Sequence, residues 1–194
     1  MQPEDRRVQR EGAVYTVLAL LLLATWAGGC GPADVEPEYQ TSLSARSHID
    51  LSPELAWQNL RDLTLAKHYV PGVVDVEMTT ERTEGVGASR RILKDDGATM
   101  DETVVDWREG EGFAFRFHRG VEGPPAPFER AGFVYELQPD GTGSEVITTL
   151  SYTVRWGAMG RLLDRFVLRR QIQAEVETIA SGLARYYESE AATH

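Results

Sequence analysis

The sequence is poor in the residues from which many active sites are built. Its 194 residues include one cysteine, Cys30, and four histidines that are scattered without the spacing of a metal site. There is no G-x-S-x-G motif, and Gly85-Val86-Gly87 lacks the third glycine of a dinucleotide-binding loop. These absences argue against a metal centre, a bound dinucleotide and a covalent nucleophile, so we expect no metal and no cofactor.

Positive charge is also scarce. Lysine and arginine total 20 against 30 aspartates and glutamates, which gives a formal net charge of -10. Binding to nucleic-acid phosphates depends on concentrated lysine and arginine, so the composition argues against a nucleic-acid partner. A hydrophobic content of 42% and a charged content of 26% are typical of a folded globular domain, not of a disordered or multi-span membrane protein.

The N-terminal segment has the layout of a secretory signal. Arg6, Arg7 and Arg10 precede an uncharged run from Ala13 to Gly29, which ends in small residues. This run is also at the lower length limit for crossing a bilayer. An uncleaved N-terminal membrane anchor is therefore the main alternative to a cleaved signal.

The residues before the single cysteine favour cleavage and lipidation. Ala27-Gly28-Gly29-Cys30 resembles the lipobox of bacterial lipoproteins, although the family usually has leucine where this chain has Ala27. The resemblance implies a signal peptide at residues 1–29, a diacylglycerol-modified Cys30 and attachment to a membrane of the bacterial cell envelope. Gly31 slightly favours the outer membrane. Residues 30–42 are proline-rich and acidic, and we expect them to form the lipidated cysteine and a flexible tether.

Hydrophobic patterns from residue 43 to residue 190 predict one α+β domain. Ser52-Pro53-Glu54 is typical of a helix start, and a second short helix is expected before the breaker Pro71-Gly72. Alternating segments separated by turn signals then predict a run of antiparallel strands. A long helix from about Met159 to Glu188 closes the chain. Its expected inward stripe begins with Leu162, Leu163, Phe166 and Val167.

This order of elements resembles the START-like (SRPBCC) superfamily, in particular its polyketide cyclase/dehydrase branch, related to the birch pollen allergen. The resemblance rests on SPELAWQNLRD, the EGVGASRR hairpin, ETVVDW and the helix start Gly160-Arg161-Leu162-Leu163-Asp164. It implies a helix-grip fold, with about seven curved strands wrapped on the long C-terminal helix and two short helices after the first strand. It also implies a cavity for hydrophobic ligands between sheet and helix. Some members catalyse cyclisation or dehydration there, and many only bind or carry.

Large aromatic side chains are the main candidates for lining such a cavity. Core packing is the more common explanation for most single positions, and the two nearest the early helices, Trp57 and Tyr69, resemble positions that gate such cavities. As a group they favour an apolar pocket. The candidates are Trp57, Tyr69, Phe115, Phe117, Phe133, Tyr135, Tyr152, Trp156 and Phe166.

Candidates for acid–base catalysis are few. The alternation of FAFRFH places Arg116 and His118 on the face opposite the phenylalanines, and the pattern of ETVVDW leaves the direction of Glu102 open. We therefore expect an envelope lipoprotein that binds or carries a hydrophobic small molecule or lipid. A polyketide cyclase or dehydratase is the alternative, which a buried polar pair in the cavity would favour. A domain without a pocket that binds other proteins is a second alternative.

Arginines recur at helical spacing near the start of the last helix. Arg161, Arg165 and Arg169 share one helix face. They indicate either contact with anionic lipid headgroups or a solvated face paired with nearby acids.

Overall fold

Seven antiparallel strands form one sheet in the order β1-β7-β6-β5-β4-β3-β2. The computed structural model describes residues 39–192, so the expected signal peptide, Cys30 and the tether up to residue 38 lie outside the described residues. Residues 41 and 42, expected in the tether, belong to the first strand. The strands are β1 (Thr41–Ile49), β2 (Val73–Met78), β3 (Ser89–Lys94), β4 (Thr99–Arg108), β5 (Gly112–His118), β6 (Phe128–Asp140) and β7 (Gly143–Val154).

Two short helices follow β1, as predicted. They are α2 (Pro53–Leu60) and the 3-10 helix η1 (Leu63–His68). Pro53 occupies the first turn of α2, where its missing N–H costs nothing. The Asp62 side chain caps η1 by accepting a hydrogen bond of 2.9 Å from the backbone N–H of Thr64.

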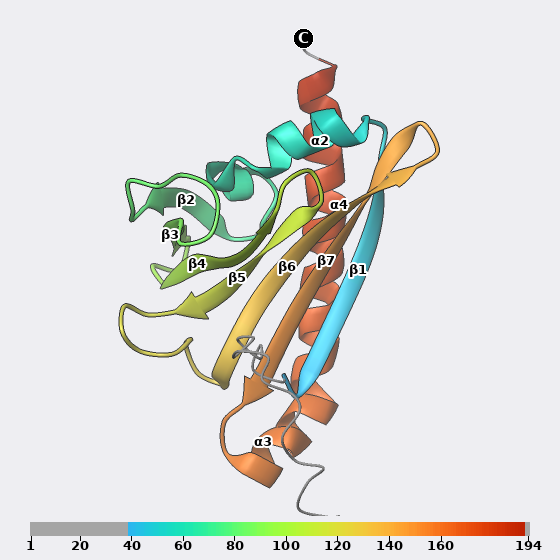
Figure 1. Cartoon of the computed structure of the whole chain (residues 1–194). Helices are drawn as coiled ribbons and strands as arrows, with labels where there is room; N and C mark the ends of the chain where they lie inside the picture. Colours follow the sequence, from blue (N-terminus) through green and yellow to red (C-terminus); the bar gives the residue numbers. More distant parts are fainter. Residues whose placement is uncertain (1–38, 193–194) are drawn as a thin grey trace, which may run out of the picture. The chain divides into compact units, whose positions relative to one another are not determined.

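The final helix is continuous but is made of three parts. They are α3 (Gly157–Leu163), one π-helical turn η2 (Asp164–Leu168) and α4 (Arg169–Ala191). Figure 1 shows α4 lying along one face of the sheet, where it contacts β1 and β7. The predicted helix-grip fold, with seven strands around a long C-terminal helix, is confirmed. None of the helices in residues 39–192 has the length and apolar character needed to cross a bilayer.

The rotation of the final helix differs from the prediction. The buried positions of α4 include Ile172 and Val176. Counting back from Ile172 in steps of four reaches Asp164 and then Gly160, and both are buried. The residues expected to begin the inward stripe lie on the opposite side and are exposed. That expectation was wrong for Leu162, Leu163, Phe166 and Val167.

Candidate ligand-binding cavity

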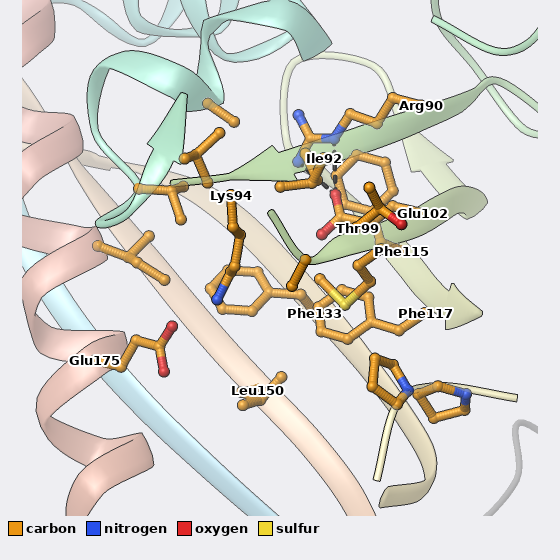
Figure 2. A pocket seen from close by; sticks show the side chains of 18 of the residues that line it. Arg90, Ile92, Lys94, Thr99, Glu102, Phe115, Phe117, Phe133, Leu150 and Glu175 are labelled. Carbon is orange, nitrogen blue, oxygen red and sulfur yellow. Dashed lines mark hydrogen bonds and ion pairs between the residues drawn. The ribbon is translucent and has the colours of Figure 1, made fainter. Parts of the chain in front are cut away.

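A cavity of about 320 Å³ lies between the sheet and α4. β3, β4, β5, β6 and β7 contribute inward-facing side chains, α4 closes the opposite side, and the loop between β5 and β6 forms part of the rim. Most of the lining is apolar. Phe115, Phe117, Phe133 and Leu150 are among its apolar members (Figure 2), and Ile172 and Val176 join them from α4.

The aromatic wall of the cavity follows from the strand register. Phe115 on β5 pairs directly with Phe133 on β6, and the period of two places Tyr135 on the same face as Phe133. The rings of Phe133 and Tyr135 lie 4.8 Å apart between centroids. All three side chains are buried, so together they form one aromatic wall of the cavity.

A buried ion pair forms the polar part of the wall. Arg90 on β3 faces Glu102 on β4 in the register, and their side chains are only 3% and 7% exposed. Arg90 Nε donates to Glu102 Oε2 over 2.7 Å, and its Nη1 donates to the carbonyl oxygen of Leu63. The guanidinium carbon also lies 4.3 Å from the centroid of the Phe115 ring. The arginine charge is thus compensated within the protein.

Two tyrosines enclose this pair. Burial alone would lower the pKa of Arg90, but Glu102 and the nearby Tyr69 and Tyr135 outweigh it and raise that pKa above its ordinary value. Burial raises the pKa of Tyr69 and raises that of Tyr135 well above its ordinary value. Both phenols beside the ion pair therefore stay protonated at physiological pH.

The rim of the cavity carries charged side chains of both signs. Lys94 at the end of β3, Asp96 in the following turn and Glu175 on α4 all line it. Figure 2 draws the Lys94 amine and the Glu175 carboxylate pointing toward each other from opposite sides of the cavity. The rim can therefore contact a polar group at one end of a ligand whose apolar part lies deeper.

Four of the nine aromatic candidates line this cavity: Phe115, Phe117, Phe133 and Tyr135. Three others are buried elsewhere. Trp57 packs edge-on against Trp107 at 5.2 Å between ring centroids, and its indole N–H donates to Glu109. Tyr69 packs against Tyr135 from outside the cavity, and Tyr152 donates its hydroxyl proton to Asp164.

The last two candidates are not in the interior. Trp156 is 60% exposed and Phe166 is 72% exposed, so neither lines the cavity. Trp156 precedes the first residue of α3 with a φ of 70°, a left-handed conformation that points the chain away from β7. Phe166 lies in η2, on the side of the helix opposite the buried Asp164.

Reasoning from the sequence missed Arg90 and Lys94 and left Glu102 undecided. The available signal was alternation, because Ile92 is an evident inward position and Arg90 and Lys94 lie two residues to either side of it. His118 lies outside the cavity, as expected, with its ring nitrogens 2.7 Å from Thr103 Oγ1 and 2.9 Å from the Gly120 carbonyl oxygen. Among the described residues, no group of three or more possible metal ligands comes together.

Comparison with known proteins places this architecture in a family. The model of the family described as "Polyketide cyclase / dehydrase and lipid transport" matches residues 40–188. No curated protein matches the sequence.

Several solved structures share the fold. Ara h 8.0201 superposes with a TM-score of 0.59 at 15% identity, over 77% of this chain and 98% of its own. A START superfamily protein from Mycobacterium smegmatis gives 0.59 at 12% identity, over 76% and 97%. The di-domain ARO/CYC protein StfQ from the steffimycin biosynthetic pathway gives 0.60 at 17% identity, over 79% of this chain and 52% of that chain. At these identities the likeness is one of fold.

Proposed function

The chain belongs to the polyketide cyclase/dehydrase and lipid transport family, and on that premise we propose that its domain binds a hydrophobic small molecule or lipid between the sheet and α4. The observation that carries the proposal is the cavity between the sheet and α4, whose wall is mostly aromatic and aliphatic. Its buried cation, Arg90, is already neutralised by the equally buried Glu102. The interior therefore favours an apolar ligand body over a buried anion.

The size of the cavity narrows the class of ligand. A volume of about 320 Å³ lies at the lower end of the range of roughly 300–1,000 Å³ for small-molecule pockets. A single acyl chain or a small polycyclic compound fits this space better than both chains of a phospholipid. Lys94 and Glu175 at the rim can hold a polar end group.

Cavity filling provides the test of ligand binding. The chain is purified, bound molecules are extracted into organic solvent and identified by mass spectrometry, and a fatty acid and a fluorescent polycyclic probe are titrated in. Leu150→Trp places a large ring in the cavity and should abolish binding, whereas Leu55→Trp on the exposed face of α2 should not. If neither extract nor probe titration detects a ligand in the unmodified chain, the proposal is wrong.

The proposal includes attachment to the cell envelope through Cys30. It is supported by the small residues before the only cysteine and by the basic, then apolar, segment that precedes them. Expression with labelled palmitate should give a labelled protein, and Cys30→Ser should give an unlabelled one. Equal labelling of both would exclude lipidation at this residue.

A cyclase or dehydratase is the second candidate, because the cavity wall contains a buried polar pair. In such an enzyme the Glu102 carboxylate would accept a proton from the carbon between two carbonyls of a polyketide, and the Arg90 guanidinium would stabilise the resulting enolate. Incubation with a linear poly-β-ketone and product analysis tests this function. Glu102→Gln should stop turnover while ligand affinity is kept; turnover that is unchanged would exclude Glu102 as the base.

A further inference from the structure

A continuous apolar surface covers the outside of α3 and η2. Met159, Phe166 and Leu162 are 76%, 72% and 59% exposed, values unusual for such large apolar side chains. Positions three and four apart share a helix face, so these residues form one stripe instead of isolated exposures. We call this surface the outer stripe; it consists of Trp156, Met159, Leu162, Leu163, Phe166 and Val167.

On its opposite side, the same helix packs against the domain through Gly160 and Asp164. A side chain at Gly160 would overlap the backbone of Arg155, so the helix packs there at backbone distance. Asp164 is 1% exposed and accepts hydrogen bonds from Tyr152 and from Thr41. An ordinary surface helix turns its apolar side inward, and this one does the reverse. No described residue covers the outer stripe.

Basic side chains border the outer stripe. Residues 155–170 contain five arginines and one aspartate, a local net charge of +4 in a chain whose total is -10. Within residues 39–192, neither Arg161 nor Arg165 forms a hydrogen bond or ion pair with an acid. The Arg165 guanidinium lies 5.9 Å from the centre of the Phe166 ring, at the edge of the apolar surface. An apolar face flanked by unpaired arginines is the composition of helices that lie in an anionic membrane interface.

The first strand of the domain begins at the same helical turn, on the side opposite the outer stripe. Thr41, the first residue of β1, donates to Asp164 Oδ2 over 3.0 Å and accepts from Arg169 Nη2 over 3.1 Å. The segment that precedes β1 therefore joins the domain at η2. Nine peptide steps separate Cys30 from Tyr39, so they span at most roughly 30 Å. Either anchor considered above, a lipidated Cys30 or the uncleaved apolar run, places the bilayer within this reach.

We propose that the outer stripe docks on the surface of an anionic lipid bilayer, with its apolar side chains in the interface and the arginines at the phosphates. The proposal rests on the membrane attachment included in the proposed function and adds an orientation to it. A protein tethered at one point can rotate freely, whereas one that also docks at α3–η2 has a defined face toward the lipid.

This orientation links the membrane to the cavity. Arg155, one residue before Trp156, donates from Nε to the carbonyl oxygen of Phe128 over 2.8 Å and from Nη2 to that of Pro124 over 3.3 Å. Pro124 and Phe128 both line the cavity. Arg155 therefore binds the cavity rim and directly precedes Trp156, the first residue of the outer stripe. Docking brings this part of the rim to the interface, where a lipid-soluble ligand is concentrated.

The depth of Trp156 in the bilayer tests the proposal on the full chain. The chain is reconstituted into vesicles of phosphatidylcholine with or without phosphatidylglycerol, each containing acyl-brominated lipid that quenches nearby tryptophan. Subtracting the signal of Trp156→Phe isolates this side chain. We expect strong quenching in anionic vesicles and a loss of at least about threefold in Met159→Ser/Phe166→Ser. Val74→Ser/Val86→Ser, which changes residues of similar exposure elsewhere, should leave quenching unchanged.

Other occupants of the outer stripe give different results. Shielding of Trp156 from iodide without vesicles that grows with protein concentration would identify a second copy, and shielding independent of concentration would identify the chain's own N-terminal segment; either overturns the proposal. Quenching in neutral vesicles, or in 1 M salt, that equals the quenching in anionic vesicles would show that the arginines do not contribute to docking. The palmitate label separates the two levels of the proposal: an unmodified chain that shows the quenching but carries no more label than Cys30→Ser would refute lipidation and support docking. Trp156 that stays unquenched in an anchored chain would refute docking alone.

Discussion

Removing one partner of the buried ion pair should destabilise the domain more than any surface change. In Glu102→Met the Arg90 guanidinium keeps the Leu63 carbonyl and the Phe115 ring, but loses both contacts to the carboxylate, of 2.7 and 2.6 Å. Since Arg90 is only 3% exposed, we expect water to compensate poorly for these contacts. Leaving one charge of such a pair unpaired costs about 3–5 kcal/mol. For a domain of this size, that corresponds to a loss of roughly 6–20 °C in Tm.

The double variant Arg90→Met/Glu102→Met tests whether the loss of stability comes from the unpaired charge. It removes both charges and fills the same volume with apolar groups, a change that is often neutral or stabilising. We therefore expect the double variant to be more stable than Glu102→Met by about 2 kcal/mol or more. Arg91→Met is the control, because Arg91 neighbours Arg90 but its side chain is 46% exposed, and its pair with Asp101 should contribute about 1 kcal/mol or less.

Urea unfolding followed by circular dichroism measures all three variants against the unmodified domain of residues 39–192. Two results would refute the reasoning. A cost below about 1 kcal/mol for Glu102→Met would mean that the pair is hydrated in solution. A double variant no more stable than Glu102→Met would mean that the loss comes from packing and not from the unpaired charge.

Three further predictions concern single residues. Arg91 lowers the pKa of Asp101, so the stability from this contact is present above the ordinary value of 3.8 and lost as pH falls through the lower folded pKa; the difference in unfolding free energy between the unmodified domain and Asp101→Asn should shrink from pH 6 to pH 2. The hydrogen bond to Asp140 raises the pKa of His48, so its stabilising effect is present below 6.5 and disappears as pH rises through the folded pKa. Proton NMR should give a His48 pKa above 6.5, and Asp140→Asn should reduce it; an unchanged value would exclude the contact. Gly112→Ala should lower Tm, since φ is 145° and a Cβ would overlap the backbone of β6; an unchanged Tm would contradict this packing.

Local signals in the sequence were sufficient to predict the elements of the fold. A proline after Ser52 predicted the start of α2, and Asp95-Asp96-Gly97 is typical of the tight turn that joins β3 to β4. The alternation in β5 predicted which phenylalanines face inward, and four aromatic cavity positions on β5 and β6 were found by the same rule. These signals depend on residues that are close together in the chain, so they can be recognised in a single sequence.

The polar part of the cavity depends on contacts distant in sequence. Arg90 and Glu102 are recognisable as a pair only once β3 and β4 are in register. Alternation alone would place Arg90 at an inward position. Arginine is usually exposed, so this position is convincing only once its partner Glu102 is known. Pairing of this kind is set by the hairpin between the strands, and a shift of one residue would place the two charges on opposite faces of the sheet.

The outer stripe could not be assigned for a different reason. Apolar residues at steps of three and four predict an amphipathic helix but do not say what covers it. The answer depends on Asp164, which accepts hydrogen bonds from Thr41, Tyr152 and Arg169 while almost fully buried. If the helix rotated so that the outer stripe faced inward, all three hydrogen bonds to Asp164 would break. Each of these charge-assisted bonds is worth about 1–3 kcal/mol. The outward direction of Phe166 is therefore specified by this polar cluster, and the exposed face is not a remnant of incomplete packing.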